Sequence, residues 1–321
     1  MARTPRFDRL ATERPNRASV ALDRMHPVAI ARLMNREDAR AVRAVGRVRT
    51  AIARAVDAIV AAVSAGGRLF FVGAGTSGRL GVLEAAECPP TFGTPPSLVQ
   101  AIMAGGRASV FRSREGAEDD ARAGARTVRR RVRRGDVVVG VSASGVTPFV
   151  RAALATARRI GAATVLVCCH PPRASFAPTS RARGSEKAPR RRKTITIVPA
   201  PGPEVLAGST RLKAGTATKL VLNTLTTASM VRLGRVYGNR MIDVQPRSRK
   251  LRERAVRLVA ELGRVPAPRA RSALTAARGS VRAAIVIART GCSPAAAARA
   301  VRRTGGSLDA ALLAASPGRQ R

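Results

Sequence analysis

The first residues that could do chemistry form a short loop of glycines and hydroxyls, followed along the chain by a glutamate. The loop contains Gly75, Thr76, Ser77 and Gly78, and Glu87 follows Gly75 by 12 residues, directly before Cys-Pro-Pro. Backbone N–H groups and short hydroxyls at a helix start bind anions such as phosphate. Because proline restricts the backbone around it, the stretch predicts an anion-binding loop and a carboxylate held in a fixed approach.

Two more loops of this composition occur farther along the chain. The second reads SASGVT and contains Ser142, Ser144 and Thr147, and the third reads GST at 208–210. One loop of glycine and serine is an ordinary turn. Two such loops that follow strands of one sheet are more specific evidence for a ligand site, because ligands bind at the carboxyl ends of parallel strands. The loops therefore indicate a site for a phosphate group.

Carboxylates are scarce in this chain, yet several fall near the first two loops. Only 19 residues are Asp or Glu, and six lie close by: Glu84, Glu87, Glu115, Glu118, Asp119 and Asp120. Two carboxylates at one substrate can divide the roles of acid and base when their surroundings separate their pKa values. Glu87 and Glu118 are the candidates for such a pair. Helix capping or surface charge explains Glu115, Asp119 and Asp120 better.

Short apolar runs separated by helical stretches position these loops. Strands are expected at 67–73, 97–103, 136–141, 163–169 and 194–198. Helical periodicity fills most of the gaps, and alternating short strands and helices favour a parallel α/β sheet with right-handed crossovers. The anion-binding loops then fall at the carboxyl ends of strands.

The two ends of the chain show helical patterns without strands. Apolar residues recur every three or four positions near the N-terminus, and the last quarter of the chain is alanine-rich and helical. We expect three parts: an N-terminal helical segment at 1–60, an anion-binding domain at 61–245 and a C-terminal helical unit at 246–321.

The amino-acid composition limits the classes of protein to which the chain can belong. The chain has 321 residues, of which 45% are hydrophobic, enough for a substantial core. It contains no uncharged apolar run near the length of a membrane span, and its four cysteines lack metal-ligand spacing. The expectation is a reduced cytoplasmic protein with no disulfides, no structural metal and no membrane association.

The net charge of +40 suggests nucleic-acid binding, but the composition speaks against a specific role of that kind. Only five of the 59 basic residues are lysine, which is typical of a GC-rich genome, and aromatic residues that could stack on bases make up 2%. We interpret the charge as a solvated arginine-rich surface. The segment 173–193, rich in Arg, Ser and Pro, is interpreted as a flexible basic loop.

The first loop could also belong to one of two common nucleotide-binding motifs. No GxxxxGK[ST] sequence is present, which excludes a P-loop. Gly73, Gly75 and Gly78 spell GxGxxG after a strand, but no acidic residue follows the second strand where a dinucleotide site needs one. The Thr-Ser hydroxyls suit a monophosphate better.

Four long motifs identify a family resemblance. GAGTSGRLGVLEAAECPPTFG, EGAEDD, GVSASGVTPFV and GPEVLAGSTRLKAGTATKLVLNTLTTASMVRLGRVYGN closely resemble the N-acetylmuramic acid 6-phosphate etherases, which are sugar isomerase (SIS) domain enzymes. The resemblance begins near Ala11 and covers almost the whole chain. It implies a SIS-type doubly wound parallel sheet of five strands with flanking helices, and a UBA-like C-terminal helical unit.

The resemblance also implies an activity. The family cleaves the D-lactyl ether of N-acetylmuramic acid 6-phosphate to N-acetylglucosamine 6-phosphate and D-lactate in cell-wall recycling. It implies that Glu87 is the acid that protonates the departing lactate and that Glu118 has a second catalytic role. No metal or redox cofactor is required. The 6-phosphate would be held by Ser77, Ser142, Ser144 and Thr147.

Other implied features are less specific. Glu204 and Lys213 are expected to contact the substrate, although helix-surface or capping roles explain them almost as well. Val146 stands where the family commonly has arginine, which affects the expected affinity. SIS enzymes of this kind usually form dimers with sites near the subunit interface, so a homodimer is expected.

Two other functions remain open within the SIS class. One is a non-catalytic sugar-phosphate sensor, as in the glucokinase regulatory protein, which would keep the phosphate loops without needing both glutamates. The other is a DNA-binding regulator, which carries an N-terminal helix-turn-helix, whereas residues 1–66 resemble the etherase N-terminus. The presence of both Glu87 and Glu118 favours the enzyme.

Overall fold

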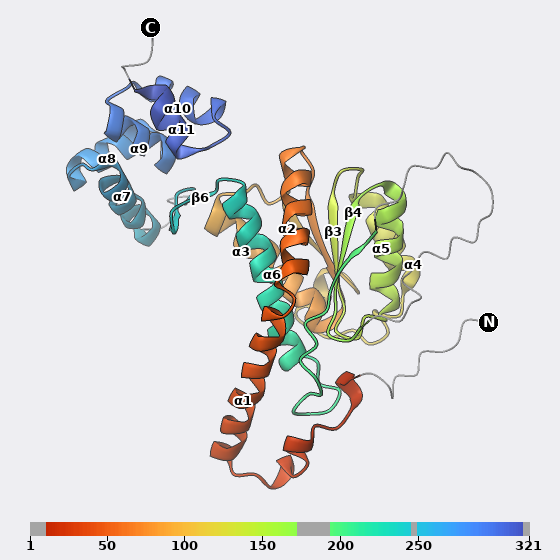
Figure 1. The fold of residues 1–321 in the computed structure, drawn as a ribbon. Coiled ribbons are helices and arrows are strands. Elements are labelled where there is room, and N and C mark those ends of the chain that lie inside the picture. The colour runs from red at the N-terminus through yellow and green to blue at the C-terminus, as the bar shows by residue number, and fades with distance from the viewer. Residues whose placement is uncertain (1–10, 172–192, 245–248, 317–321) are drawn as a thin grey trace. The chain divides into compact units, whose positions relative to one another are not determined.

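A computed structural model describes residues 11–171, 193–244 and 249–316 (Figure 1). The expected basic loop at 173–193 lies, apart from Lys193, outside the described residues. The chain divides into two compact units. The first comprises Met1–Ala85 and Pro96–Ser229, and the second comprises Ala86–Pro95 and Met230–Arg321. The three-part division at residues 60 and 245 stays a prediction.

The first unit is built on a parallel sheet of five strands. They are β1 (Leu69–Gly73), β2 (Val99–Met103), β3 (Val137–Val141), β4 (Ala163–Val167) and β5 (Ile195–Ile197). Their order is β2-β1-β3-β4-β5, and every neighbouring pair is parallel. The predicted α/β fold with a five-stranded parallel sheet is confirmed.

Helices cover both faces of this sheet, as Figure 1 shows. They are α2 (Arg49–Ser64), α3 (Gly75–Phe92), α4 (Ala121–Arg131), α5 (Pro148–Ile160) and α6 (Lys213–Arg232), with a short 3-10 turn, η5 (Arg107–Val110). On one face, Phe149 and Leu154 of α5 pack in a buried cluster with Phe70 of β1. Because helices cover both faces of the sheet, β1 and β3 are fully buried, and their sequences are continuous apolar runs.

An N-terminal arm precedes the sheet. It consists of η2 (Ala11–Glu13), η3 (Arg17–Ser19), η4 (Leu22–Arg24) and the long helix α1 (Pro27–Gly46). Proline stands at the first position of α1, where its missing N–H costs no intrahelical hydrogen bond. Figure 1 shows α1 leading away from the sheet beside the start of α6.

Buried charged groups attach this arm to α6. The Lys213 ammonium donates to the Glu37 carboxylate, and these side chains are 1% and 0% exposed. Asn16 donates to the same carboxylate at 2.8 Å. Burial alone would raise the pKa of Glu37, but the hydrogen bonds from Lys213 and Asn16 outweigh it and hold the pKa below its ordinary value. The carboxylate is therefore ionised in the folded protein.

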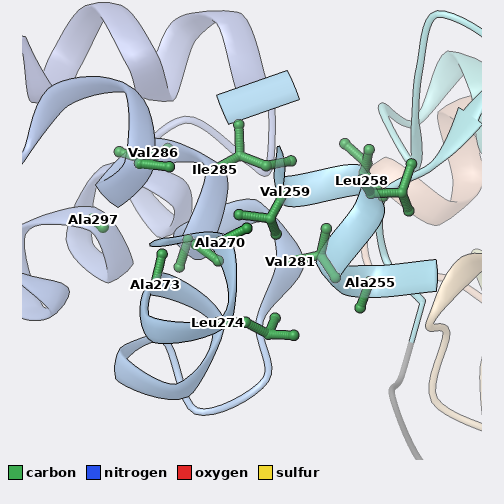
Figure 2. Close-up of a cluster of buried hydrophobic side chains, with 14 of the residues drawn as sticks. Ala255, Leu258, Val259, Ala270, Ala273, Leu274, Val281, Ile285, Val286 and Ala297 are labelled. Atoms are coloured by element: carbon green, nitrogen blue, oxygen red, sulfur yellow. The ribbon is translucent and has the colours of Figure 1, made fainter. Parts of the chain in front are cut away.

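The second unit is mostly helical. A two-stranded antiparallel sheet of β6 (Val236–Tyr237) and β7 (Arg240–Met241) precedes α7 (Arg249–Gly263), α8 (Ala267–Ala276), α9 (Val281–Thr290), α10 (Pro294–Arg303) and α11 (Leu308–Ala315). Figure 2 shows its core, where Ile285 and Val286 of α9 lie among side chains of α7, α8 and α10. Serine caps the start of α9, α10 and α11.

Within the ranges that the structure describes, no helix combines the length and the apolar character that crossing a membrane requires.

The Glu37–Lys213 pair predicts a pH-dependent stability. Because the pKa of Glu37 is lowered in the folded state, the contribution is fully present above the ordinary value of 4.5 and is lost as pH falls through the lowered folded-state pKa. Glu37→Gln leaves the ammonium of Lys213 buried and unpaired, which should lower the free energy of unfolding by about 3–5 kcal/mol at pH 7. Urea unfolding at pH 7 and at pH 4 measures both effects, and the variant should lose less stability than wild type on acidification.

Two further variants serve as controls. Lys213→Met combined with Glu37→Gln removes both charges and should recover much of the lost stability. Arg40 also pairs with Glu37, at 2.9 Å, but its side chain is 52% exposed, so Arg40→Gln should cost less than about 1 kcal/mol. Equal losses for Glu37→Gln and Arg40→Gln would contradict this account.

Candidate active site

The strand order creates a topological switch point between β1 and β3, where a crevice for a ligand is expected. These strands are neighbours, with Gly73 opposite Val141, but β1 connects to β2 on one side while β3 connects to β4 on the other. At such a switch point the loops after the two strands diverge and leave room for a ligand. Adjacent strands lie about 4.8 Å apart, so the loops that follow β1 and β3 leave the sheet side by side.

The loop after β1 is a tight turn into α3. A Cβ on Gly73 would lie 2.6 Å from the Gly78 nitrogen, and one on Gly78 would lie 2.3 Å from the Met103 sulfur. Gly75 has φ +53°, which favours glycine. The glycines therefore let α3 begin directly at the end of β1. The first amides of a helix lack intrahelical acceptors, so those of Thr76 and Ser77 are suited to an anion.

The loop after β3 brings three predicted residues into direct contact. The hydroxyl of Ser142 lies 2.8 Å from that of Thr147 and 3.4 Å from that of Ser144. The amide of Gly145 donates to the Ser142 hydroxyl at 3.1 Å, and Gly145 has φ +73°. Hydroxyl hydrogens rotate to suit an acceptor. The three hydroxyls can therefore turn from one another to a bound phosphate at the start of α5.

Glu118 lies beside this second loop. Its backbone carbonyl accepts from the amide of Phe149 at 3.0 Å, in the first turn of α5. The Glu118 side chain is exposed. Asp120 caps α4 by accepting from the Ala123 amide at 2.8 Å, which confirms the capping role expected for it. The turn that ends in this cap thus holds the backbone of Glu118 against the first turn of α5, while its carboxylate is exposed.

Glu204 and Lys213 are turned inward. The two oxygens of the Glu204 carboxylate accept from the amides of Lys213 and Ala214, at 2.9 and 2.8 Å. Burial raises the pKa of Glu204, although these amides and the Lys213 charge oppose the shift. Lys213 pairs with Glu37, as described above. Both side chains therefore stabilise the start of α6.

The start of α6 in turn borders the first loop. A Cβ on Gly215 would lie 3.8 Å from the Thr76 side chain and 3.4 Å from the Thr210 carbonyl. Cys169, two residues after β4, contacts both the loop after β3 and the start of α6. Its amide donates to the Ala143 carbonyl at 2.9 Å, and its thiol donates to the Ala214 carbonyl. Burial raises the pKa of the Cys169 thiol to about 12, so this cysteine packs rather than reacts.

Helix α3 carries two glutamates in different environments. Glu84 is buried, and its carboxylate accepts from the Lys219 ammonium at 3.0 Å and from the Thr226 hydroxyl at 2.6 Å, both on α6. Glu87 is exposed and belongs to the segment Ala86–Pro95, which groups with the second unit. Glu84 therefore attaches α3 to α6, whereas Glu87 keeps its carboxylate at the surface.

Arg79 is a contributor that sequence reasoning did not identify. Its guanidinium donates to the carbonyls of Val110 and Ser109, at 2.8 and 3.0 Å. It thereby ties the start of α3 to the turn η5, which leads into the chain segment that carries Glu118. An arginine directly after the GTSG loop was the available signal, but its two carbonyl acceptors are 31 and 30 residues away in the sequence.

In the part of the chain that the structure describes, no group of three or more His, Cys, Asp or Glu side chains is arranged to hold a metal ion.

Comparison with solved structures finds phosphoheptose isomerases at low identity. GmhA from Neisseria gonorrhoeae is 16% identical with a TM-score of 0.39, and the match covers 60% of this chain and 93% of that chain. The phosphoheptose isomerase from Francisella tularensis is 14% identical with a TM-score of 0.42, covering 65% and 100%. A family model described as the glucokinase regulatory protein N-terminal SIS domain matches residues 51–158.

Curated relatives are much closer in sequence and share one name. The N-acetylmuramic acid 6-phosphate etherase of Gloeobacter violaceus is 49% identical over 97% of this chain and 97% of its own length. The etherase of Rubrobacter xylanophilus is 48% identical over 96% and 97%, and that of Symbiobacterium thermophilum is 49% identical over 87% and 89%. By these identities over nearly full lengths, the chain belongs to the family of N-acetylmuramic acid 6-phosphate etherases.

Proposed function

We propose that this protein is a carbon–oxygen lyase that cleaves the D-lactyl ether of N-acetylmuramic acid 6-phosphate, releasing D-lactate and N-acetylglucosamine 6-phosphate. The observation that carries the proposal is the 49% identity to an etherase over 97% of both chains. The reaction belongs to the recycling of cell-wall amino sugars. We infer that it takes place in the cytoplasm, where the sugar phosphate would be found.

The crevice between β1 and β3 is proposed to hold the 6-phosphate. On one side it offers the amides of Thr76 and Ser77 at the start of α3, and on the other it offers three hydroxyls at the start of α5. Two helix N-termini that meet at a switch point favour a dianion through their dipoles. The Lys213 ammonium is paired with Glu37. The amides and hydroxyls, rather than this ammonium, are therefore proposed to bind the phosphate.

The proposed chemistry needs one base and one acid. In the ring-opened sugar, the aldehyde at C1 acidifies the proton on C2, and Glu118 is assigned as the base that removes it. The ether oxygen on C3 would leave poorly as an alkoxide, so Glu87 is assigned as the acid that protonates the departing lactate. Elimination gives an unsaturated aldehyde, and water then adds at C3. This division of roles rests on the family motifs.

A non-catalytic sensor of sugar phosphates is the alternative. The match of residues 51–158 to a regulatory SIS domain makes it worth testing. A sensor needs the crevice but neither glutamate, and the chain retains Glu87 and Glu118 on exposed surfaces. Release of lactate by the wild-type protein separates the two functions. We further propose that the protein acts as a homodimer.

One prediction of the proposed function concerns the two glutamates. Glu87→Gln and Glu118→Gln should each reduce D-lactate release by about 10²-fold or more, because each removes a proton-transfer group. In deuterated water, Glu87→Gln should still exchange the C2 proton of the substrate, whereas Glu118→Gln should not. Lactate release is measured by a coupled assay and exchange by NMR.

The matched control is Glu115→Gln, in the same turn as Glu118 and without an assigned role. Its activity should stay within about twofold of wild type. Loss of exchange in Glu87→Gln with retention in Glu118→Gln would reverse the two assignments. Wild-type protein that binds the sugar phosphate but releases no lactate would establish the sensor instead.

Another prediction of the proposed function concerns the phosphate crevice. Ser144→Ala removes one hydroxyl donor and should raise KM by about 10-fold or more, as expected for a hydrogen bond to a charged group. The effect on kcat should be smaller, because the phosphate does not react. Inorganic phosphate should compete with substrate for wild type and more weakly for the variant. Ser272→Ala, on α8, is the control and should leave both constants unchanged.

A further inference from the structure

We propose that Arg282 and Asp243 position Glu87 for its proton transfer. The inference rests on the proposed function, in which Glu87 is the acid that protonates the departing lactate. It starts from the division of the chain, because the segment Ala86–Pro95, which carries Glu87, belongs to the same compact unit as the C-terminal helices. Arg282 and Asp243 are positioning residues in this proposal, since they act through the backbone that follows the end of α3.

The helical turn that carries Glu87 is weakly held by its own backbone. Pro89 and Pro90 lie inside α3, and a proline has no N–H with which to bond the carbonyl one turn back. The last turns of α3 therefore lack two of their usual hydrogen bonds. Glu87 is exposed, whereas Cys88 and Phe92 are buried. Packing outside the helix therefore has to fix the turn that presents the Glu87 carboxylate.

Gly93 ends α3 against the backbone of Asp243. Its amide donates to the Pro89 carbonyl at 3.0 Å, and its φ of +62° is the left-handed conformation that commonly ends a helix. A Cβ on Gly93 would lie 2.5 Å from the Asp243 carbonyl oxygen, closer than real Cβ atoms approach. The contact therefore depends on glycine. Glu87 precedes Gly93 by six residues, which is about 9 Å along the helix axis, so a shift of Asp243 moves the turn that carries Glu87.

Arg282 holds Asp243 in place. Its guanidinium donates to one carboxylate oxygen of Asp243, to the other at 2.6 Å, and to the carbonyl of Gly234 at 2.7 Å. The Arg282 side chain is 6% exposed. Arg235 adds a hydrogen bond to the same carboxylate at 3.2 Å. Because a planar guanidinium that pairs through two nitrogens fixes the orientation of a carboxylate as well as its position, Asp243 is held rigidly to α9.

The C-terminal helices in turn hold Arg282. Its neighbours on α9, Val281 and Ala283, belong to the buried cluster that forms the core of the second unit. A Cβ on Gly306, between α10 and α11, would lie 2.6 Å from the Nη1 of Arg282. Ile242, the residue before Asp243, is buried in the same cluster. One ion pair therefore joins the helical core to the residue that contacts the end of α3.

Loss of this ion pair has a specific expected signature. The phosphate loops and Glu118 belong to the first unit, so substrate binding and removal of the C2 proton do not depend on Arg282. Protonation of the leaving group does, because Glu87 belongs to the second unit. A displacement of about 1 Å at a catalytic group costs on the order of 10²-fold in rate.

The test compares two reactions of the full-length protein. Arg282→Met and Gly93→Ala should each lower kcat for D-lactate release by about 10-fold or more. KM and the rate of C2-proton exchange in deuterated water should stay within about twofold of wild type, as in Glu87→Gln. Arg282→Lys keeps the positive charge without the two-nitrogen geometry and should recover part of kcat.

Two controls separate positioning from loss of stability. Gly238→Ala, in the turn between β6 and β7, adds a side chain at a similar φ of +55°, but in the described part of the chain only its chain neighbours lie within 4 Å of that Cβ. Val286→Ala leaves a cavity in the core around α9 and lowers the unfolding temperature, while Asp243 stays paired. Both variants should keep kcat within about twofold of wild type.

Wild-type kcat in Arg282→Met and Gly93→Ala would overturn the proposal and leave the proposed function standing. A loss of kcat that Val286→Ala reproduces at an equal drop in unfolding temperature would also overturn it, as would an equal loss of C2-proton exchange, because each indicates general damage to the protein rather than a misplaced acid. Wild type that releases no lactate, or Glu87→Gln that releases it at the wild-type rate, would refute the proposed function instead, so the failures are distinct.

Discussion

The parallel pairing of β1 with β3 is the constraint on which the proposed site depends. Gly73 lies opposite Val141, and the connections from the two strands run in opposite directions along the sheet. The register brings the loops after both strands to one edge. Both strands are buried on both faces, and a slip of one residue would turn every side chain to the opposite face. Apolar packing far from the crevice therefore determines where the anion-binding groups lie.

The absence of side chains at two glycines adds to this constraint. A Cβ on Gly73 would lie 2.6 Å from the Gly78 nitrogen, closer than real Cβ atoms approach. The chain can therefore pass from strand to helix without a longer loop, and the first amides of α3 lie at the end of β1. The same turn sets the direction in which α3 leaves the sheet. One tight turn thus determines which amides face the end of β1.

Charged groups behind the crevice are buried without contacting it. Glu37, Lys213 and Glu204 are each at most 1% exposed. Burying ions costs several kcal/mol per group, and a pair offsets this cost only with good geometry and further hydrogen bonds. Here Asn16 and the amides of α6 supply those bonds. The network attaches α1 to α6 in one arrangement, and the start of α6 in turn borders Thr76.

The sequence by itself determined the five strands, the loops that follow them and the two candidate glutamates, Glu87 and Glu118. Apolar runs, glycine turns and short motifs such as the ECPP that contains Glu87 are local signals. Only the tertiary structure decided that the hydroxyls of Ser142 and Thr147 are hydrogen-bonded to each other and that the Glu204 carboxylate accepts from the first amides of α6. It also decided that Lys213 is turned inward, since its partner Glu37 lies 176 residues away in the chain. A side chain's partners depend on which elements pack together, and no pattern within a few residues encodes that.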